Sequence, residues 1–166
     1  MPSADFTDRI LGRWAELHPD ADLAPLQVTG RLARIGQLLA HREDAVFGEF
    51  GLNRGEVGVL AALRSAGPPH RLSPGRLGRG LMLSSAGMTS RLDRLERRGL
   101  VARHPDPDDR RGVIVELSDR GMELVDAAVA ATGARDRDLL DALSAAEARQ
   151  LETLLRRLLR VLEPLE

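Results

Sequence analysis

The sequence has 166 residues, 43% of them hydrophobic, which suggests one domain or two interleaved small ones. It contains no cysteine, so disulfides, thiolate metal sites and a cysteine redox sensor are excluded. With three Phe, one Trp and no Tyr, it has few rings on which to stack the bases of RNA or single-stranded DNA.

The formal net charge is −1, but the charge is unevenly distributed along the chain. Between Arg71 and Gly121 there are 11 arginines and seven acidic residues, a local balance of +4, while the remaining residues carry −5. A basic middle within an acidic frame is what a local phosphate-binding surface requires. The polar start and the absence of a long apolar stretch predict a soluble, cytoplasmic protein with no membrane partner.

The first part of the chain predicts three helices. Apolar residues at helical spacing indicate a helix over Phe6–Leu17, and the segment His18–Pro25 is expected to be a linker. A longer helix is expected from about Leu26 to Phe50, ended by a glycine. Asn53 and Glu56 then form a capping box that opens the third helix.

The central part predicts two short helices and a β-hairpin. The first helix begins at Ser73-Pro74, an N-cap followed by proline in the first helical position. The second helix and the hairpin that follows it are expected at Ser85–Arg98, Leu100–Arg103 and Val113–Leu117, with a turn over His104–Gly112. Three consecutive helices followed by a hairpin indicate a winged helix-turn-helix within a mainly α fold.

The last part predicts two helices, capped by Ser118 and by Ser144 with Glu147. The final helix carries a leucine stripe that one small domain cannot cover, at Leu151, Leu154, Leu158, Leu162 and Leu165. We therefore expect a homodimer. Residues 1–50 and 122–166 would supply the dimerisation helices, and residues 51–121 would form the DNA-binding domain.

The predicted helix Ser85–Arg98 is the candidate recognition helix. If its apolar stripe of Met88, Leu92 and Leu95 faces inward, Ser90 and Arg97 point the opposite way. Small residues at its N-terminal end would let it lie deep in the major groove of double-stranded DNA. The alternative is an ordinary solvated amphipathic helix.

The predicted hairpin tip carries Asp109, Arg110 and Arg111. Arginines at the end of a narrow wing can reach the minor groove, where the negative potential attracts guanidinium groups. Asp109 could hold Arg111 extended through a bidentate pair. The alternative is a polar turn whose charges only keep it soluble.

These two motifs together resemble those of the MarR (multiple-antibiotic-resistance regulator) family. The segment from Asp109 through Arg111, Val115, Leu117 and Ser118 to Gly121 matches the wing signature, and LSSAGMTSRLDRLERRGLV is similar to the recognition helix and strand. The resemblance implies a dimeric repressor that binds pseudo-palindromic DNA and is released by a small ligand. The DNA-binding residues predicted by position and resemblance are Ser84, Ser85, Gly87, Thr89, Ser90, Arg94, Arg97, Asp109, Arg110 and Arg111.

A narrower resemblance concerns the ligand. The extra N-terminal helix with Trp14 is similar to the MarR branch that responds to urate and related anions, whose two arginines match Arg91 and Arg103. This implies a small anionic effector at these three residues. Gly58 stands where that branch has an aspartate. The alternative is that Trp14 fills the core while the arginines pair with nearby acids.

Two further hypotheses stay open at this point. A DNA-binding dimer without an effector would need the same recognition helix and wing. A small hydrolase would need a nucleophile motif, a phosphate loop or metal-ligand spacing, and the sequence has none of these. The four histidines are scattered, so neither a metal nor a cofactor is expected, and the chain is not expected to be an enzyme.

Overall fold

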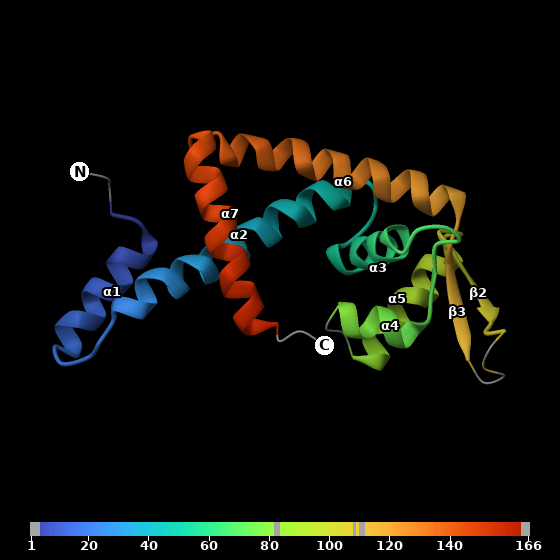
Figure 1. The fold of residues 1–166 in the computed structure, drawn as a ribbon, viewed down its shortest axis with the longest axis horizontal. Coiled ribbons are helices and arrows are strands. Elements are labelled where there is room, and N and C mark those ends of the chain that lie inside the picture. Colours follow the sequence, from blue (N-terminus) through green and yellow to red (C-terminus); the bar gives the residue numbers. More distant parts are fainter. Residues whose placement is uncertain (1–3, 82–83, 108, 110–111, 164–166) are drawn as a thin grey trace. The chain divides into compact units, whose positions relative to one another are not determined.

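The computed structural model describes residues 4–81, 84–107, 109 and 112–163. They form seven α-helices and one small antiparallel sheet (Figure 1). The chain divides into two compact units, Met1–Val57 and Gly58–Glu166. No helix in the described ranges is long and apolar enough to cross a membrane.

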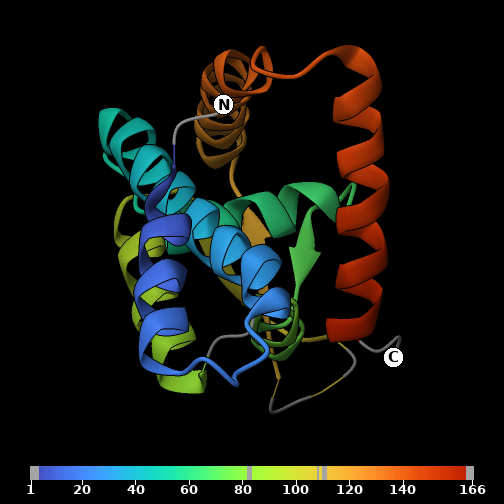
Figure 2. The same ribbon diagram turned by 90° about the vertical axis from the view of Figure 1, so that its left-hand side faces the viewer.

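The first unit is built on α1 (Phe6–Leu17) and α2 (Ala24–Glu49), and α1 turns back along the N-terminal half of α2 (Figures 1 and 2). Asp5 and Asp8 cap α1 reciprocally, each side chain accepting the other's backbone N–H at 2.9–3.0 Å. The hydrogen bond from the Asp8 amide lowers the pKa of the Asp5 carboxyl. Arg31 of α2 donates to both carboxylates, at 2.8 and 2.5 Å, and so fastens the start of α1 to α2.

The start of α2 differs slightly from the predicted one at Leu26. The helix begins two residues earlier, at Ala24, whose N–H donates to the Asp22 side chain at 3.0 Å. Pro25 lies within the first turn, where its missing N–H costs nothing. A proline that the sequence assigned to the linker therefore belongs to the helix.

Helix α3 (Arg54–Ser65) runs across the division between the units. Its predicted capping box is confirmed: the Glu56 N–H donates to the Asn53 side chain at 3.0 Å, and the Asn53 N–H donates to the Glu56 carboxylate at 3.1 Å.

The second unit contains the sheet and the remaining helices. The elements that follow α3 are β1 (Arg71–Leu72), α4 (Pro74–Gly80), α5 (Ser85–Arg97), β2 (Val101–Pro105), β3 (Val113–Leu117), α6 (Asp119–Leu140) and α7 (Ala145–Leu162). The strand order is β1-β3-β2, with both pairs antiparallel. The predicted fold class, a mainly helical winged helix-turn-helix, is confirmed. The third strand was not predicted, because β1 is only two residues long and has no pattern of its own.

The predicted end of β2 at Arg103 is wrong. The strand continues to Pro105, with His104 opposite Ile114 and Pro105 opposite Val113. Because β2 lies at an edge of the sheet, its last residue can be a proline without breaking an internal ladder. The His104 ring extends the strand's contacts with β3 by lying 2.7 Å from the Glu116 carboxylate.

The core of the second unit confirms the predicted orientation of α5. Met88, Leu92 and Leu95 are at most 2% exposed, as are Leu77 of α4 and Val115 of β3. Packing against α4 and the sheet therefore fixes which face of α5 remains outside.

The junction between the wing and α6 is tightly closed. Ser118 donates its N–H to the Leu100 carbonyl at 3.1 Å and its hydroxyl to the Gly99 carbonyl at 2.8 Å, and it caps α6 by accepting the Gly121 N–H at 3.0 Å. A Cβ added at Gly121 would collide with the Leu100 carbonyl oxygen and lie 2.9 Å from Leu117 Cδ1. Only glycine allows the first turn of α6 to come so close to the backbone before β2.

Candidate nucleic-acid interface

The outer face of α5 carries small and hydroxyl side chains near its beginning. Ser84 is the N-cap and accepts the Gly87 N–H at 3.2 Å. Thr89 and Ser90 are exposed, and the buried stripe on the opposite face holds them there. The side chain of Ser85 lies outside the described residues. A helix that begins in this way can approach a groove closely, since no bulky side chain holds it off.

Two arginines lie along the same helix farther from its start. The Arg94 guanidinium donates to the Ser90 hydroxyl at 2.9 Å and is partly buried. Arg97 is exposed and donates to the Asp93 carbonyl at 3.2 Å. A guanidinium has five N–H donors, so Arg97 can still contact a base or a phosphate beyond its bond to the Asp93 carbonyl.

Arg91 has a different environment, at the edge of the buried face of α5. Its Nη1 donates to the Gly87 carbonyl at 3.1 Å, and its Nε is buried without a hydrogen-bond acceptor among the described residues. A Cβ at Gly87 would lie 3.1 Å from this Nη1, so the glycine leaves room for the guanidinium. Arg91 is thus a cation held close to the helix with one donor unused.

Arg103 crosses from β2 to α5. Its guanidinium contacts the Asp93 carboxylate at 2.6 Å and the Glu96 carboxylate at 3.5 Å, and it donates to the Thr89 carbonyl at 3.5 Å. Its backbone N–H also donates to Glu96, at 3.2 Å. The sequence left open whether Arg103 binds an effector or pairs with nearby acids. In the structure it pairs with nearby acids. Neither Asp93 nor Glu96 was singled out from the sequence, because their role depends on where β2 lies.

The turn of the wing is closed by backbone hydrogen bonds. Gly112 donates its N–H to the Asp109 carbonyl at 2.8 Å, and its own carbonyl accepts from Asp106 at 3.1 Å. A Cβ at Gly112 would lie 2.8 Å from that of Asp106, so this turn needs a glycine. Asp109 is exposed at the tip. Arg110 and Arg111, predicted to reach the minor groove, lie outside the described residues.

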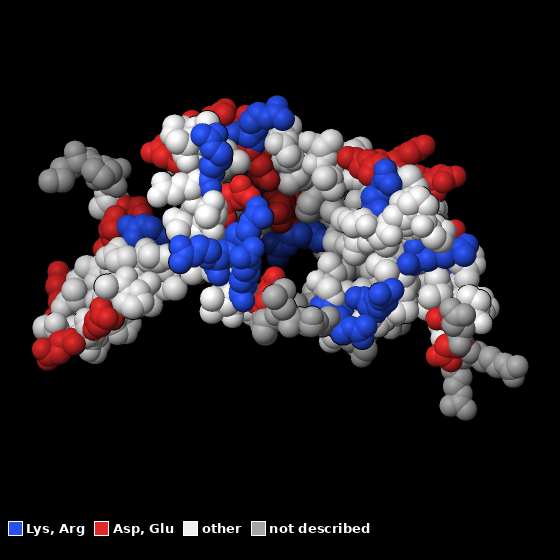
Figure 3. Space-filling model, in the orientation of Figure 1, with Lys and Arg blue, Asp and Glu red and all other residues white. Residues whose placement is uncertain are grey.

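Sequence reasoning missed two arginines on α4. Arg76 and Arg79 are both exposed, and within the described ranges neither guanidinium is paired with a carboxylate. Figure 3 shows basic side chains gathered over α4. Arg76 and Arg79 could have been found from their spacing in the sequence. They are three residues apart and flank the buried Leu77, so they share the outer face of the helix.

The comparisons with known proteins agree with this geometry. The MarR family model matches residues 50–112. The transcriptional regulator PecS of Dickeya dadantii is 37% identical over 148 residues, which span 89% of each chain. The multiple antibiotic resistance protein MarR of Salmonella typhimurium is 33% identical over 61% of this chain and 69% of its own. A solved MarR family regulator from Streptomyces coelicolor has a TM-score of 0.71 at 30% identity, covering 82% of this chain and 94% of that one.

The chain belongs to the MarR family. MarR regulators bind DNA and control transcription, so this protein is a DNA-binding transcriptional regulator and not an enzyme. In this MarR protein, α4 and α5 are the helix-turn-helix and β2 and β3 form the wing.

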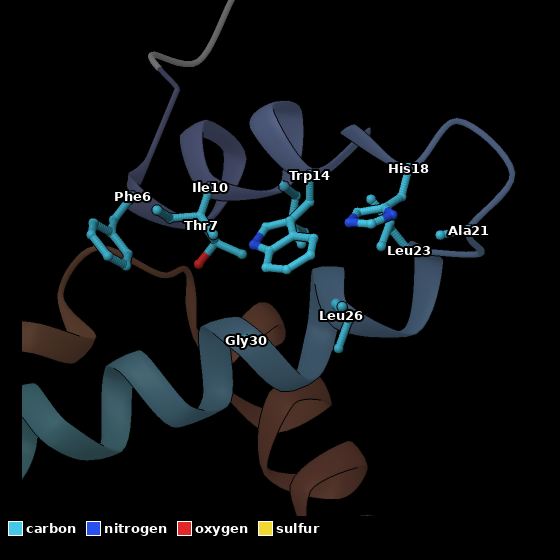
Figure 4. Close-up of a pocket in the computed structure, with 10 residues that line it drawn as sticks. Phe6, Thr7, Ile10, Trp14, His18, Ala21, Leu23, Leu26 and Gly30 are labelled. Atoms are coloured by element: carbon cyan, nitrogen blue, oxygen red, sulfur yellow. The ribbon is translucent and has the colours of Figure 1, made fainter. Parts of the chain in front are cut away.

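The residues predicted to bind an effector are divided between the two units of this MarR regulator. Trp14 belongs to the first unit, and Arg91 and Arg103 belong to the second. Trp14 is 50% exposed, so it does not fill the core of this chain. Its ring stacks on His18, with ring centroids 5.1 Å apart, and both line a cavity of about 530 Å³ between α1 and the start of α2 (Figure 4). Among the described residues, the lining is mainly apolar and includes no arginine.

The position of Gly58 leaves little room for a side chain. A Cβ at this position would already lie 3.3 Å from Leu81 Cδ2. An aspartate here would therefore need Leu81 to move. The carboxylate of the urate-responsive branch has no equivalent at this position of the chain.

Proposed function

We propose that this MarR regulator is a homodimeric repressor that binds a pseudo-palindromic operator and is released from it by a small anion. Residues 1–50 and 122–166 would form the dimerisation part, and residues 51–121 the DNA-binding domain. In a bacterial cytoplasm such a dimer would keep its operator occupied until the effector appears.

The observation that carries the DNA-binding site is the orientation of α5. Its apolar stripe is buried, and Thr89, Ser90 and Arg97 are left exposed beside a wing. We assign the start of this face to the major groove, where hydroxyls and guanidinium groups read base edges. The residues of this proposed surface on α5 are Ser84, Ser85, Gly87, Thr89, Ser90, Arg94 and Arg97. The wing residues Asp109, Arg110 and Arg111 would contact the flanking minor groove.

Exposed apolar faces at both ends of the chain support the homodimer. On α1, Phe6, Ile10 and Trp14 are 43–50% exposed, and on α7, Leu154 and Leu158 are 46% and 43% exposed. Such stripes are costly to leave in water and are typical of subunit interfaces. A two-fold dimer would present two recognition helices to half-sites about one helical turn apart, ~10 bp centre to centre.

The environment of Arg91 supports the anionic effector. The buried Nε of Arg91 lacks an acceptor among the described residues, which an anion could supply. Arg103 is already bound by Asp93 and Glu96, so an anion would have to compete with two carboxylates for this guanidinium. An aromatic or carboxylate-bearing anion can pair with a guanidinium and stack on an indole ring, so Trp14, Arg91 and Arg103 are the residues we propose for its binding.

The DNA-binding assignment is tested by footprinting the protein on the DNA around its own gene. We expect a two-fold symmetric footprint and an affinity that falls steeply with salt. Arg94→Ala should weaken operator binding by roughly 1–3 kcal/mol and relax the preference at one base pair in each half-site. An equal loss on every DNA sequence would show that Arg94 contacts only phosphate.

An effector-independent repressor is the second candidate, favoured by the pairing of Arg103 with two carboxylates. A screen of urate, purines, salicylate-like compounds and aconitate-like acids for thermal shift and DNA release separates the candidates. A releasing anion should raise the melting temperature of the parent and lose its effect on Arg91→Ala. Should no anion stabilise the protein, the effector-independent candidate stands.

A further inference from the structure

We infer that Asp93 and Glu96 are positioning residues for DNA binding, which hold the recognition helix at a fixed angle to the wing through Arg103. The inference rests on the DNA-binding function proposed for α5. It assigns to two acidic residues a positive contribution to operator affinity, although their charge opposes the approach of phosphate. We call Asp93, Glu96 and Arg103 the α5–wing brace.

The contacts of the brace restrain both position and rotation. Asp93 and Glu96 are three residues apart on α5, so their carboxylates lie on one face of the helix. Arg103 reaches both from β2, at 2.6 and 3.5 Å, and its backbone N–H donates to Glu96 at 3.2 Å. A third interaction, with the Thr89 carbonyl at 3.5 Å, lies one turn nearer the start of the helix. Because these interactions span two turns of α5, from Thr89 to Glu96, sliding or rolling of the helix would break at least one of them.

The negative charges of Asp93 and Glu96 need an explanation on a surface that is proposed to bind DNA. An isolated exposed ion pair contributes little to stability, and Asp93 and Glu96 are 49% and 41% exposed. Two negative charges on a helix that faces DNA also weaken its attraction to phosphate. The ion pairs with Arg103 align α5 with the wing. This alignment raises operator affinity overall only if the better fit to the operator outweighs the repulsion between the two carboxylates and the phosphates. The brace therefore lowers the affinity for DNA in general and raises the affinity for the operator sequence.

The test removes the two charges while keeping the shape of the side chains. The double variant Asp93→Asn/Glu96→Gln is compared with the parent on operator DNA and on unrelated DNA of equal length, at one salt concentration. We expect operator affinity to fall about fivefold or more, since the coupled ion pairs that align α5 are removed together. Affinity for unrelated DNA should rise, because two repulsive charges are gone. Glu123→Gln on α6 removes an exposed carboxylate outside the brace and should change the operator-to-unrelated ratio little.

Other outcomes overturn the inference. If the double variant binds both DNAs more tightly, the two acids act only as charges. If it binds both more weakly, their role is in folding, and the melting temperature should fall with the affinity. Arg103→Gln gives a second check: adding Asp93→Asn to it should cause no further loss on the operator, whereas additive losses would show independent roles. A parent protein that fails to prefer any operator would instead contradict the proposed function itself.

Discussion

At the scale of single residues, the chemistry of the DNA-binding unit depends on arginines whose surroundings differ. All 24 basic residues of the chain are arginine. Arg97 is exposed, Arg91 is held with a buried Nε, and Arg103 is bound by two carboxylates and a carbonyl. A guanidinium can make the interactions of Arg103 because its donors are spread over a planar fork, which a lysine ammonium lacks.

Two glycines of α6 should respond oppositely to alanine. At Gly121 a Cβ collides with the Leu100 carbonyl oxygen, so Gly121→Ala should lower the free energy of unfolding by about 1–3 kcal/mol. At Gly133 a Cβ meets nothing within 4 Å, so Gly133→Ala should raise it by about 0.5–1 kcal/mol. Urea unfolding of both variants measures the difference. Equal effects would mean that the first turn of α6 is not closely packed.

The sheet should lose stability in acid through Glu116. The Arg71 guanidinium, 3.0 Å away, lowers the pKa of the Glu116 carboxyl, with a smaller contribution from His104. A pKa that is lower in the folded state stabilises the fold above the unfolded pKa, and this stabilisation is lost as the pH falls through the folded pKa. Glu116→Gln should therefore be less stable than the parent near neutral pH, and the difference should shrink below about pH 4.3, the ordinary glutamate pKa. A difference that stays constant between pH 7 and pH 3 would rule out this ion pair as the cause.

At the scale of elements, the sequence predicted those features of the helices that depend on residues close together in the chain. Serine caps placed the starts of the helices after Ser73, Ser118 and Ser144, and the apolar stripe oriented α5. The missed features depend on residues distant in sequence. Strand β1 exists because Arg71 and Leu72 pair with β3, more than 40 residues away. The partners of Arg103 became visible only once β2 was placed beside α5.

Helix α4 should contact the DNA backbone. Arg76 and Arg79 are exposed on one face of α4. In helix-turn-helix proteins the helix that precedes the recognition helix crosses the DNA backbone, and α4 has that position here. Removing either arginine should weaken binding to all DNA sequences alike, and the slope of log affinity against log salt should fall by about 1 for each phosphate that is no longer neutralised. Arg149→Ala on α7 removes an exposed arginine outside the winged helix and serves as the control. A weakening confined to one operator sequence would contradict a phosphate-binding role.

At the scale of the whole molecule, the chain exposes apolar side chains at both ends. Helix α7 has no buried residue, and Val161 and Leu162 are 80% and 77% exposed. The first unit similarly buries Thr7 and Leu11 of α1 while Phe6, Ile10 and Trp14 stay half exposed. These faces are the reason to expect that the functional protein is an assembly of two chains.

Charge on the leucine face of α7 should separate the two chains. Leu154→Glu/Leu158→Glu would bury two carboxylates in the proposed interface, so the variant should sediment with the 18.1 kDa mass of one chain, and the parent with twice that mass. Operator affinity should fall with it, because a single chain reaches only one half-site. Thr153→Glu, on the opposite face of the same helix, should remain dimeric. A double variant that keeps twice the chain mass would place the interface elsewhere.

The closed junction at the start of α6 makes this helix a lever. Ser118 and Gly121 fasten its first turn to the backbone of Gly99 and Leu100, so a tilt of the helix carries the wing with it. Its 22 residues span about 33 Å, so a tilt of about 5° at the fastened end corresponds to a displacement of about 3 Å at the far end. In a dimer, the two levers would set the separation of the recognition helices. An effector of the proposed kind would need to turn them by only a few degrees to spoil the match to two half-sites on the same DNA.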